Sequence, residues 1–224
     1  MDAPVSHGPI GNARPKSCAP SARHVDPKQA RRSALAAARL WFSFSLVHTA
    51  ASVMGQDIQP ANSAEAIINF RSYDPGFASA GQPTPAQLES ARDAGFERII
   101  YIAFSDHANS LPNEDRVVKS LGLDYAQIPV DWDAPTHADF EAFAGIMNSR
   151  RQKTLLHCQV NYRASAFAML YRVLHAGVDL AEAKADMNGV WTPDETWTQF
   201  LRSVLEAHGV APDCDGCDWT PAEL

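Results

Sequence analysis

The sequence of 224 residues is poor in cysteine, contains no internal repeat and has little positive charge over most of its length. Four cysteines are too few to hold a small fold together by disulfide bonds. Residues 61–224 carry 12 Lys and Arg against 23 Asp and Glu, so this part lacks the basic surface that nucleic-acid binding requires. The 46% of hydrophobic residues nevertheless allow a sizeable core, which excludes disorder throughout the chain.

The first 60 residues differ in composition from the rest. Residues 1–30 are rich in Pro, Ala, Ser and charge without helical or strand periodicity, and we predict a disordered leader there. Residues 31–55 begin with two Arg, continue with a short apolar run and end in small residues, which is typical of a signal peptide. The run is short for a membrane span of about 20 residues. We therefore expect export to the periplasm, with a membrane anchor or a cytoplasmic leader as alternatives.

Residues 61–210 alternate between strand and helix patterns. This order predicts one α/β domain with a mostly parallel central sheet flanked by helices. The segments 98–104 and 153–157 are apolar on both faces, as expected of central parallel strands. A helix is predicted over 164–175, and residues 211–224 are predicted to form an acidic tail.

The stretch from Leu155 to Ser165 joins a buried strand to a helix. In open α/β sheets, ligands bind beyond the carboxyl ends of the strands. Backbone N–H groups from Gln159 to Arg163 can ring an oxyanion at the start of the helix, and the same positive potential would favour the thiolate of Cys158. The Arg163 guanidinium offers paired donors for two phosphoryl oxygens. Together these groups are what nucleophilic attack on a phosphate monoester requires.

This pattern of His157-Cys158, four residues, Arg163 and then Ser165 resembles the signature of the cysteine-dependent protein tyrosine and dual-specificity phosphatases. That signature has five residues between Cys and Arg, and the chain resembles a bacterial subgroup with the shorter loop. The resemblance implies a dual-specificity-phosphatase-like fold over 61–210 and a phosphocysteine intermediate, with no metal and no cofactor. Other matching segments are Gly81–Thr84, Asp93–Phe96, Ile128–Val130 and Asp133–Thr136.

The resemblance also implies a role for each signature residue. Cys158 would attack phosphorus and Arg163 would hold the phosphoryl oxygens. Ser165 would hydrogen-bond the thiolate and help it leave in the second step. His157 would orient the loop through its backbone and ring.

Expelling the leaving group requires a proton donor, which these phosphatases take from an Asp upstream of the cysteine. Asp133 and Asp131 are the two candidates, 25 and 27 residues before Cys158. We favour Asp133 because it directly follows Trp132, which resembles the Trp-Pro-Asp loop of the tyrosine-specific enzymes but lacks its Pro. The predicted substrate-binding residues are Gln159, Val160, Asn161, Tyr162, Asp131 and Asp106.

Two other functions stay open from the sequence. A Cys-to-Arg loop of this size also occurs in rhodanese-type sulfurtransferases, and a catalytically inert phosphate- or phosphopeptide-binding module is the second alternative. The expected partner is a phosphorylated protein or a small phosphate ester, with no nucleic acid and with membrane contact confined to 31–55. The sequence does not define the physiological substrate or the oligomeric state.

Cys214 and Cys217 form a Cys-x-x-Cys pair in the acidic tail. One such pair is half of a zinc site, and neither a second pair nor a histidine cluster accompanies it. We expect a local disulfide if the protein is exported and two free thiols otherwise.

Overall fold

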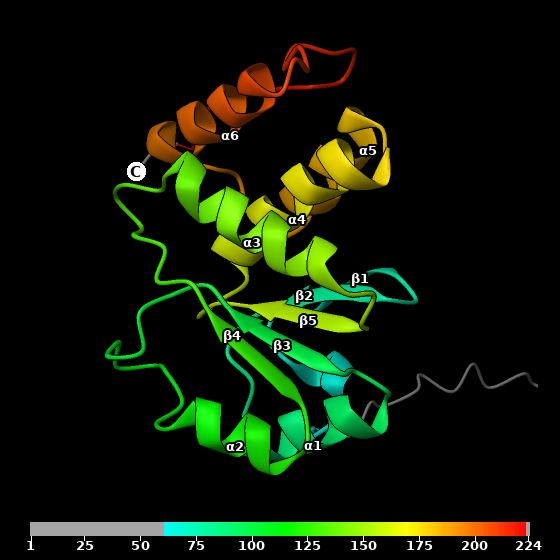
Figure 1. Ribbon diagram of the computed structural model, residues 1–224. Helices are drawn as coiled ribbons and strands as arrows, with labels where there is room; N and C mark the ends of the chain where they lie inside the picture. Colours follow the sequence, from blue (N-terminus) through cyan, green and yellow to red (C-terminus); the bar gives the residue numbers. More distant parts are fainter. Residues whose placement is uncertain (1–60, 223–224) are drawn as a thin grey trace, which may run out of the picture. The chain divides into compact units, whose positions relative to one another are not determined.

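The computed structural model describes residues 61–222, so the predicted leader (1–30) and signal-like segment (31–55) lie outside the described residues. The described chain forms a five-stranded sheet with helices on both faces (Figure 1), which confirms the predicted α/β fold. The strand order is β1-β2-β5-β3-β4, with β1 antiparallel to β2 and the other pairs parallel. The strands are β1 (Arg71–Asp74), β2 (Phe77–Ala80), β3 (Arg98–Tyr101), β4 (Asp124–Gln127) and β5 (Thr154–His157).

The helices divide into two layers (Figure 1). α1 and α2 lie against one face of the sheet, and α3, α4, α5 and α6 lie on the other. Their bounds are α1 (Pro85–Asp93), α2 (Glu114–Ser120), α3 (His137–Ser149), α4 (Tyr162–Ala176), α5 (Leu180–Asn188) and α6 (Glu195–Ala207), preceded by the short 3-10 helix Ala64–Ala66.

Two hydrophobic clusters sandwich the sheet because successive strand residues point to opposite faces. Ile100 and Leu156 belong to the cluster under α3, α4 and α6, whereas Ile99 and Leu155 belong to the cluster over α1 and α2. All four side chains are fully buried. This two-sided burial is the reason that β3 and β5 lack the polar alternation of a half-exposed strand.

The helix after β5 begins earlier than the sequence pattern predicts. The pattern predicts a start at residue 164, whereas α4 begins at Tyr162, directly after Asn161. Asn161 has a left-handed backbone with φ 71°, a conformation that Asn tolerates better than most residues. The early start places Arg163 in the first helical turn.

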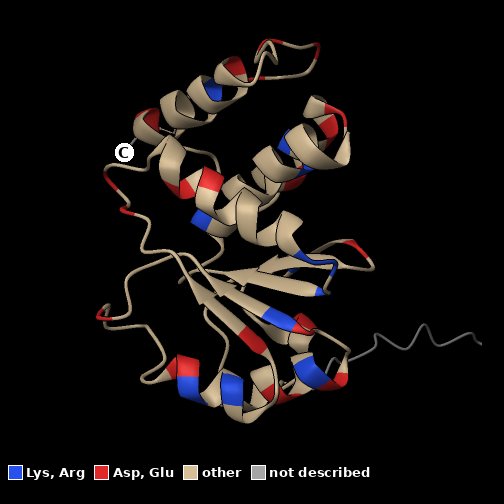
Figure 2. Cartoon of the chain, viewed as in Figure 1, with Lys and Arg blue, Asp and Glu red and all other residues tan. Residues whose placement is uncertain are grey.

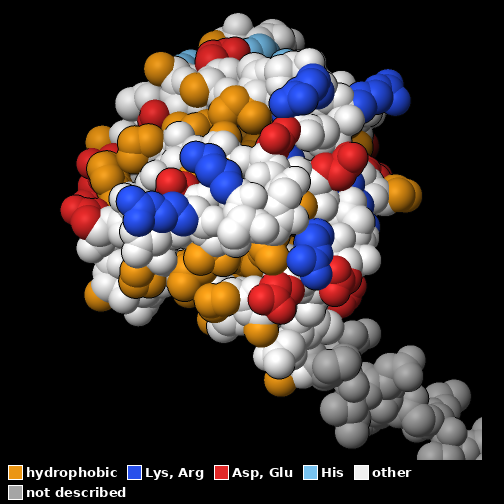
Figure 3. Space-filling view, turned by 60° about the horizontal axis from the view of Figure 1, so that its bottom comes forward, with side chains coloured by type: hydrophobic (Ala, Val, Ile, Leu, Met, Phe, Trp, Pro, Cys, Tyr) orange, Lys and Arg blue, Asp and Glu red, His pale blue; other side chains and the backbone are white. Residues whose placement is uncertain are grey.

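Charged residues lie mainly on the helices and the loops (Figure 2). On the face shown in Figure 3, basic and acidic side chains are interspersed among apolar ones, so this face carries no continuous basic surface. Within residues 61–222, no helix combines the length and the apolar character needed to cross a membrane.

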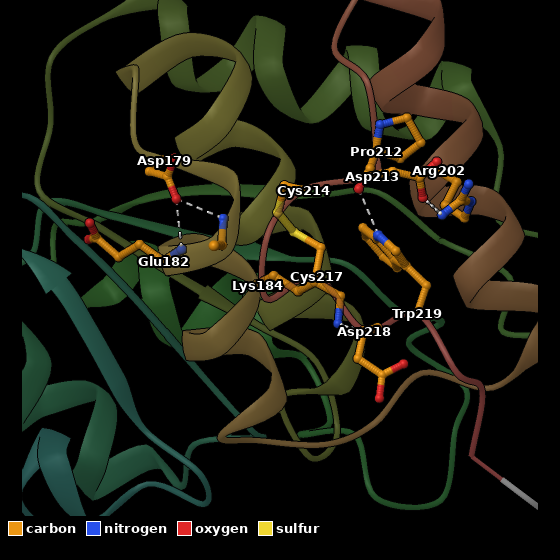
Figure 4. The surroundings of a disulfide bond; sticks show 11 residues. Asp179, Glu182, Lys184, Arg202, Pro212, Asp213, Cys214, Cys217, Asp218 and Trp219 are labelled. Carbon is orange, nitrogen blue, oxygen red and sulfur yellow. Dashed lines mark hydrogen bonds and ion pairs between the residues drawn. A yellow bond between two sulfur atoms is a disulfide. The ribbon is translucent and has the colours of Figure 1, made fainter.

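The C-terminal segment contains a disulfide between Cys214 and Cys217, and residues on either side of it contact two helices (Figure 4). The Trp219 ring contacts the Lys184 ammonium of α5 at 4.7 Å and the Arg202 guanidinium of α6 at 5.8 Å. Arg202 also forms an ion pair with Asp213 at 2.9 Å. The segment therefore links α5 and α6.

Replacing both Cys214 and Cys217 by Ser in the full chain should lower the free energy of unfolding by about 2 kcal/mol, because the bond restricts the unfolded chain and its short loop keeps the effect at the low end of the usual range. Urea unfolding followed by circular dichroism measures the change. Dithiothreitol should destabilise the wild type by the same amount and leave the double variant unchanged. A wild type insensitive to the reductant would contradict the prediction.

Candidate active site

Cys158 follows directly on β5, the central strand of the sheet. Its backbone N–H donates to the Ala80 carbonyl at 3.3 Å, and the carbonyl of His157 accepts from the Ile102 N–H at 2.9 Å. These bonds fix the end of β5 against both neighbouring strands. Cys158 is 1% exposed and lies at the carboxyl edge of the parallel strands, where the sequence predicted a ligand site.

A hollow of about 410 Å³ opens at this edge. It brings together Cys158, Arg163 and three of the predicted substrate-binding residues. It also contains His107 and Trp132, which the sequence did not predict as site residues. The complete lining is His107, Trp132, Cys158, Gln159, Val160, Tyr162 and Arg163.

Several hydrogen-bond donors around this hollow have no partner among the described residues. The backbone N–H groups of Gln159, Val160, Tyr162 and Arg163 donate to no described group. Arg163 donates from Nη1 to the Gln159 side chain, its Nε is buried without a partner, and its guanidinium lies 5.5 Å from the centre of the Trp132 ring. Unpartnered N–H groups beside a buried thiol are a suitable environment for an anion.

The loop after Cys158 is held by a segment that precedes the sheet. Asn161 Nδ2 donates to the Asn69 carbonyl at 2.6 Å, and Asn69 Nδ2 donates to the Val160 carbonyl at 2.9 Å. A Cβ on Gly81 would lie 2.8 Å from the Gln159 carbonyl oxygen, so this close approach requires glycine. The short loop is thus fixed by contacts that the motif itself does not contain.

Ser165 and His157 are both fully buried. Ser165 Oγ donates to the Tyr162 carbonyl at 3.1 Å rather than to the Cys158 sulfur. The His157 ring stacks on Tyr101 at 4.7 Å, and its Nε2 lies 3.2 Å from Glu114 Oε1. Glu114 is a buried carboxylate that the sequence pattern does not single out, because it lies in an ordinary polar helix.

The candidate acids lie outside the hollow. Asp131 and Asp133 are exposed, and Asp131 Oδ1 accepts a hydrogen bond from the Asp133 backbone N–H at 2.9 Å. Trp132 between them does line the hollow. Asp106 lines a separate depression with Phe104 and other residues. The structure therefore places the predicted acids near the wall of the site without bringing their carboxylates to Cys158.

One wall of the site is aromatic. Tyr162 stacks on Trp191 with ring centres 4.9 Å apart, and Trp132 lies 5.3 Å from Trp191. The Trp132 carbonyl accepts a hydrogen bond from Trp197 Nε1 at 3.0 Å. Trp197 is fully buried, whereas Trp191, which stacks on Tyr162, is half-buried.

The family model described as "DSP-PTPase phosphatase fused to NAD+ Kinase" matches residues 51–200. The chain belongs to this family. It is therefore a member of the cysteine-based phosphatases of the tyrosine and dual-specificity type, which confirms the resemblance of the His157-Cys158 to Arg163 signature. A search of curated proteins found no match.

Solved structures of cysteine-based phosphatases share the fold of this family member. A DUF442 protein of Shewanella putrefaciens CN-32 is 29% identical, with 67% of this chain and 98% of that chain covered at a TM-score of 0.58. A cysteine-to-serine form of TpbA of P. aeruginosa in complex with pTyr is 14% identical. The match covers 63% of this chain and 91% of that chain at a TM-score of 0.50. The core catalytic domain of the PP-IP phosphatase SIW14 of S. cerevisiae is 15% identical. The match covers 61% of this chain and 85% of that chain at a TM-score of 0.51. The last two show a common fold alone.

Asn161→Ala should lower the free energy of unfolding of this phosphatase by about 2 kcal/mol, because it loses a hydrogen bond and forces a left-handed backbone on alanine. Asn161→Gly loses the same hydrogen bond and accepts the backbone conformation, so about half of that loss is expected. Urea titration of the full chain compares them. Equal losses for the two variants would contradict the backbone argument.

Proposed function

We propose that this phosphatase hydrolyses phosphate monoesters through a phosphocysteine intermediate. The observation that supports the proposal most directly is that Cys158 and Arg163 line one hollow together with unpartnered N–H donors. The Cys158 thiolate attacks phosphorus, a sulfur–phosphorus bond forms and the ester phosphorus–oxygen bond breaks. Arg163 and the loop amides hold the oxygens on which negative charge lies in the transition state.

The second step returns the enzyme to its starting state. A water molecule attacks the phosphocysteine, the sulfur–phosphorus bond breaks, and inorganic phosphate and the thiolate are released. Asp133, which donates its proton to the leaving group in the first step, accepts a proton from this water in the second. Ser165 is proposed to stabilise the departing thiolate, which requires its hydroxyl to rotate from the Tyr162 carbonyl towards sulfur.

Asp133 is the preferred general acid for two reasons. The Asp131 carboxylate accepts the Asp133 backbone N–H and so shapes the turn, whereas no hydrogen bond within the described chain involves the Asp133 carboxylate. Asp133 is also adjacent to Trp132, whose ring lines the hollow. A movement of the Asp133 side chain towards bound substrate is part of the proposal.

The aromatic wall favours esters with a flat aromatic leaving group. Trp132 and Tyr162 present ring surface to the hollow, and aromatic rings pair favourably with one another in tilted or offset arrangements. Phosphotyrosine and related aryl phosphates are therefore the proposed substrate class. The structural neighbour TpbA, in its cysteine-to-serine form, was solved with pTyr.

Cys158→Ser should reduce hydrolysis of p-nitrophenyl phosphate by about 10⁴-fold or more, because the alcohol has no comparable nucleophilic anion at neutral pH. Release of p-nitrophenol by the purified full chain measures the loss, and vanadate should inhibit the wild type. A wild type that binds phosphate without turnover would instead identify an inert binding module. Thiocyanate formation from thiosulfate and cyanide, without phosphatase activity, would identify a sulfurtransferase.

Asp133→Asn should lower kcat for phenyl phosphate by about 10²-fold, within the usual range for loss of a general acid. The loss should be smaller for p-nitrophenyl phosphate, whose leaving group needs less protonation. Asp131→Asn is the matched control, and a larger loss in that variant would reassign the acid.

A further inference from the structure

A second hollow lies at the amino ends of the parallel strands, opposite to the edge where Cys158 lies. Phe77 and Arg98, the first residues of β2 and β3, both pair with Thr154, the first residue of β5, and both line this hollow. Its volume is about 540 Å³, against about 410 Å³ for the hollow at Cys158. No residue lines both, and the strand between Thr154 and Cys158 spans about 13 Å. The two hollows are therefore separate.

This second hollow is basic although the surrounding chain is acidic. Residues 61–224 contain 23 Asp and Glu but only 12 Lys and Arg. Five of these basic residues line the hollow, namely Arg98, Arg150, Arg151, Lys153 and Arg172. Of its described lining residues, only Asp74 and Glu97 are acidic, and each accepts a backbone N–H. The lining therefore has an excess of positive charge in a part of the chain where acidic residues dominate.

Arg98 is a buried cation in this lining. It is 4% exposed, and its Nε donates to Thr154 Oγ1 at 3.0 Å while its Nη1 donates to the Ile146 carbonyl at 2.7 Å. Its Nη2 lies 3.6 Å from the Met147 sulfur, which is a weak acceptor. Burial lowers the pKa of Arg98, and the charge of Asp124 acts in the opposite direction. Among residues 61–222, no carboxylate forms an ion pair with Arg98.

The end of α3 compensates the charge of Arg98 only in part. Ile146 lies in the last turn of α3, and a helix C-terminus carries about half an elementary negative charge. Arg151, at the same hollow, is exposed and forms no ion pair within the described part of the chain. A buried cation without a full counter-charge, beside a second unpaired one, favours an anion in this hollow.

The same hollow also has an aromatic and apolar wall. The rings of Tyr171 and His175 on α4 stack with centres 5.1 Å apart, and the Phe77 ring centre lies 5.9 Å from that of Tyr171. Met147 adds further apolar surface. A volume of about 540 Å³ lies within the range of about 300–1,000 Å³ that is usual for small-molecule sites. The hollow thus offers cations to one part of a ligand and ring surface to another.

We propose that the hollow lined by Arg98, Arg151 and Tyr171 binds a small molecule that carries two or more negative charges and an aromatic group. The anionic groups pair with the two guanidiniums, and the aromatic group packs beside the Tyr171 ring. This site does not include Cys158 or Arg163, so the inference goes beyond the proposed function and does not depend on it.

Calorimetry with ATP as an aromatic polyanion tests this inference without divalent cations. The full chain carries Cys158→Ser, so that the probe is not hydrolysed. ATP should bind, tripolyphosphate should bind about tenfold more weakly because it lacks the ring, and adenosine should not bind. Adding Arg150→Gln with Arg151→Gln should weaken ATP binding by about tenfold or more, because charge-assisted contacts are lost. Both arginines are exposed, so the fold should be retained.

Arg92→Gln with Arg116→Gln is the matched control. It removes the same two charges from exposed residues of α1 and α2 that do not line the hollow. ATP should bind this variant as tightly as the parent protein. An equal loss of affinity in the two double variants would show a general effect of net charge and overturn the proposal.

Arg163→Ala separates the two hollows, and ATP should bind this variant as tightly as the parent protein. A loss of affinity here, with none in the variant that lacks Arg150 and Arg151, would place ATP in the active site and overturn the proposal. Absence of ATP binding would also overturn it. So would binding of adenosine or tripolyphosphate as tight as that of ATP.

Discussion

β5 pairs in parallel with β2 on one side and β3 on the other, and the last hydrogen bonds of these ladders fix the backbone at His157 and Cys158. A strand held on both sides has little freedom to shift along its axis, since a slip of one residue would break both ladders and exchange the side chains that pack into the two clusters. The position of the thiol is therefore a consequence of sheet register. The surrounding site is built from loops that meet at this point.

The four-residue loop between Cys158 and Arg163 has to reverse from strand to helix within a short distance. The left-handed backbone at Asn161 makes that reversal, and the Asn69 contacts and the close approach of Gly81 hold its shape. Because the bracing groups are backbone carbonyls and amides from other segments, the loop is set before any ligand arrives. Preorganised donors of this kind cost no reorganisation when charge develops on a bound anion.

The fold class and the location of Cys158 could be predicted from the sequence because both depend on local patterns. Apolar residues on both faces indicated β5, and the signature placed Cys158 at its end. Glu114 and Asn69 could not be found in this way. Their contacts with His157 and Asn161 join positions 43 and 92 residues apart in the chain, and nothing in their own neighbourhoods indicates burial or pairing. Similarly, the spacing of Asp131 and Asp133 from Cys158 indicates two candidates for the general acid but does not show where their carboxylates lie relative to the hollow.

The position of these two carboxylates outside the hollow is consistent with the electrostatics of an anion site in an acidic protein. Residues 61–224 carry 12 basic against 23 acidic side chains, yet exposed charges more than about 8 Å away are largely screened at physiological ionic strength. The groups that would interact with an anion in the hollow are therefore the Arg163 guanidinium and the unpartnered N–H groups. An ionised Asp133 inside the hollow would repel that anion, whereas a protonated one approaching with the substrate would not. The exposed position of Asp133 is therefore compatible with both the proposed anion binding in the hollow and the proposed proton donation.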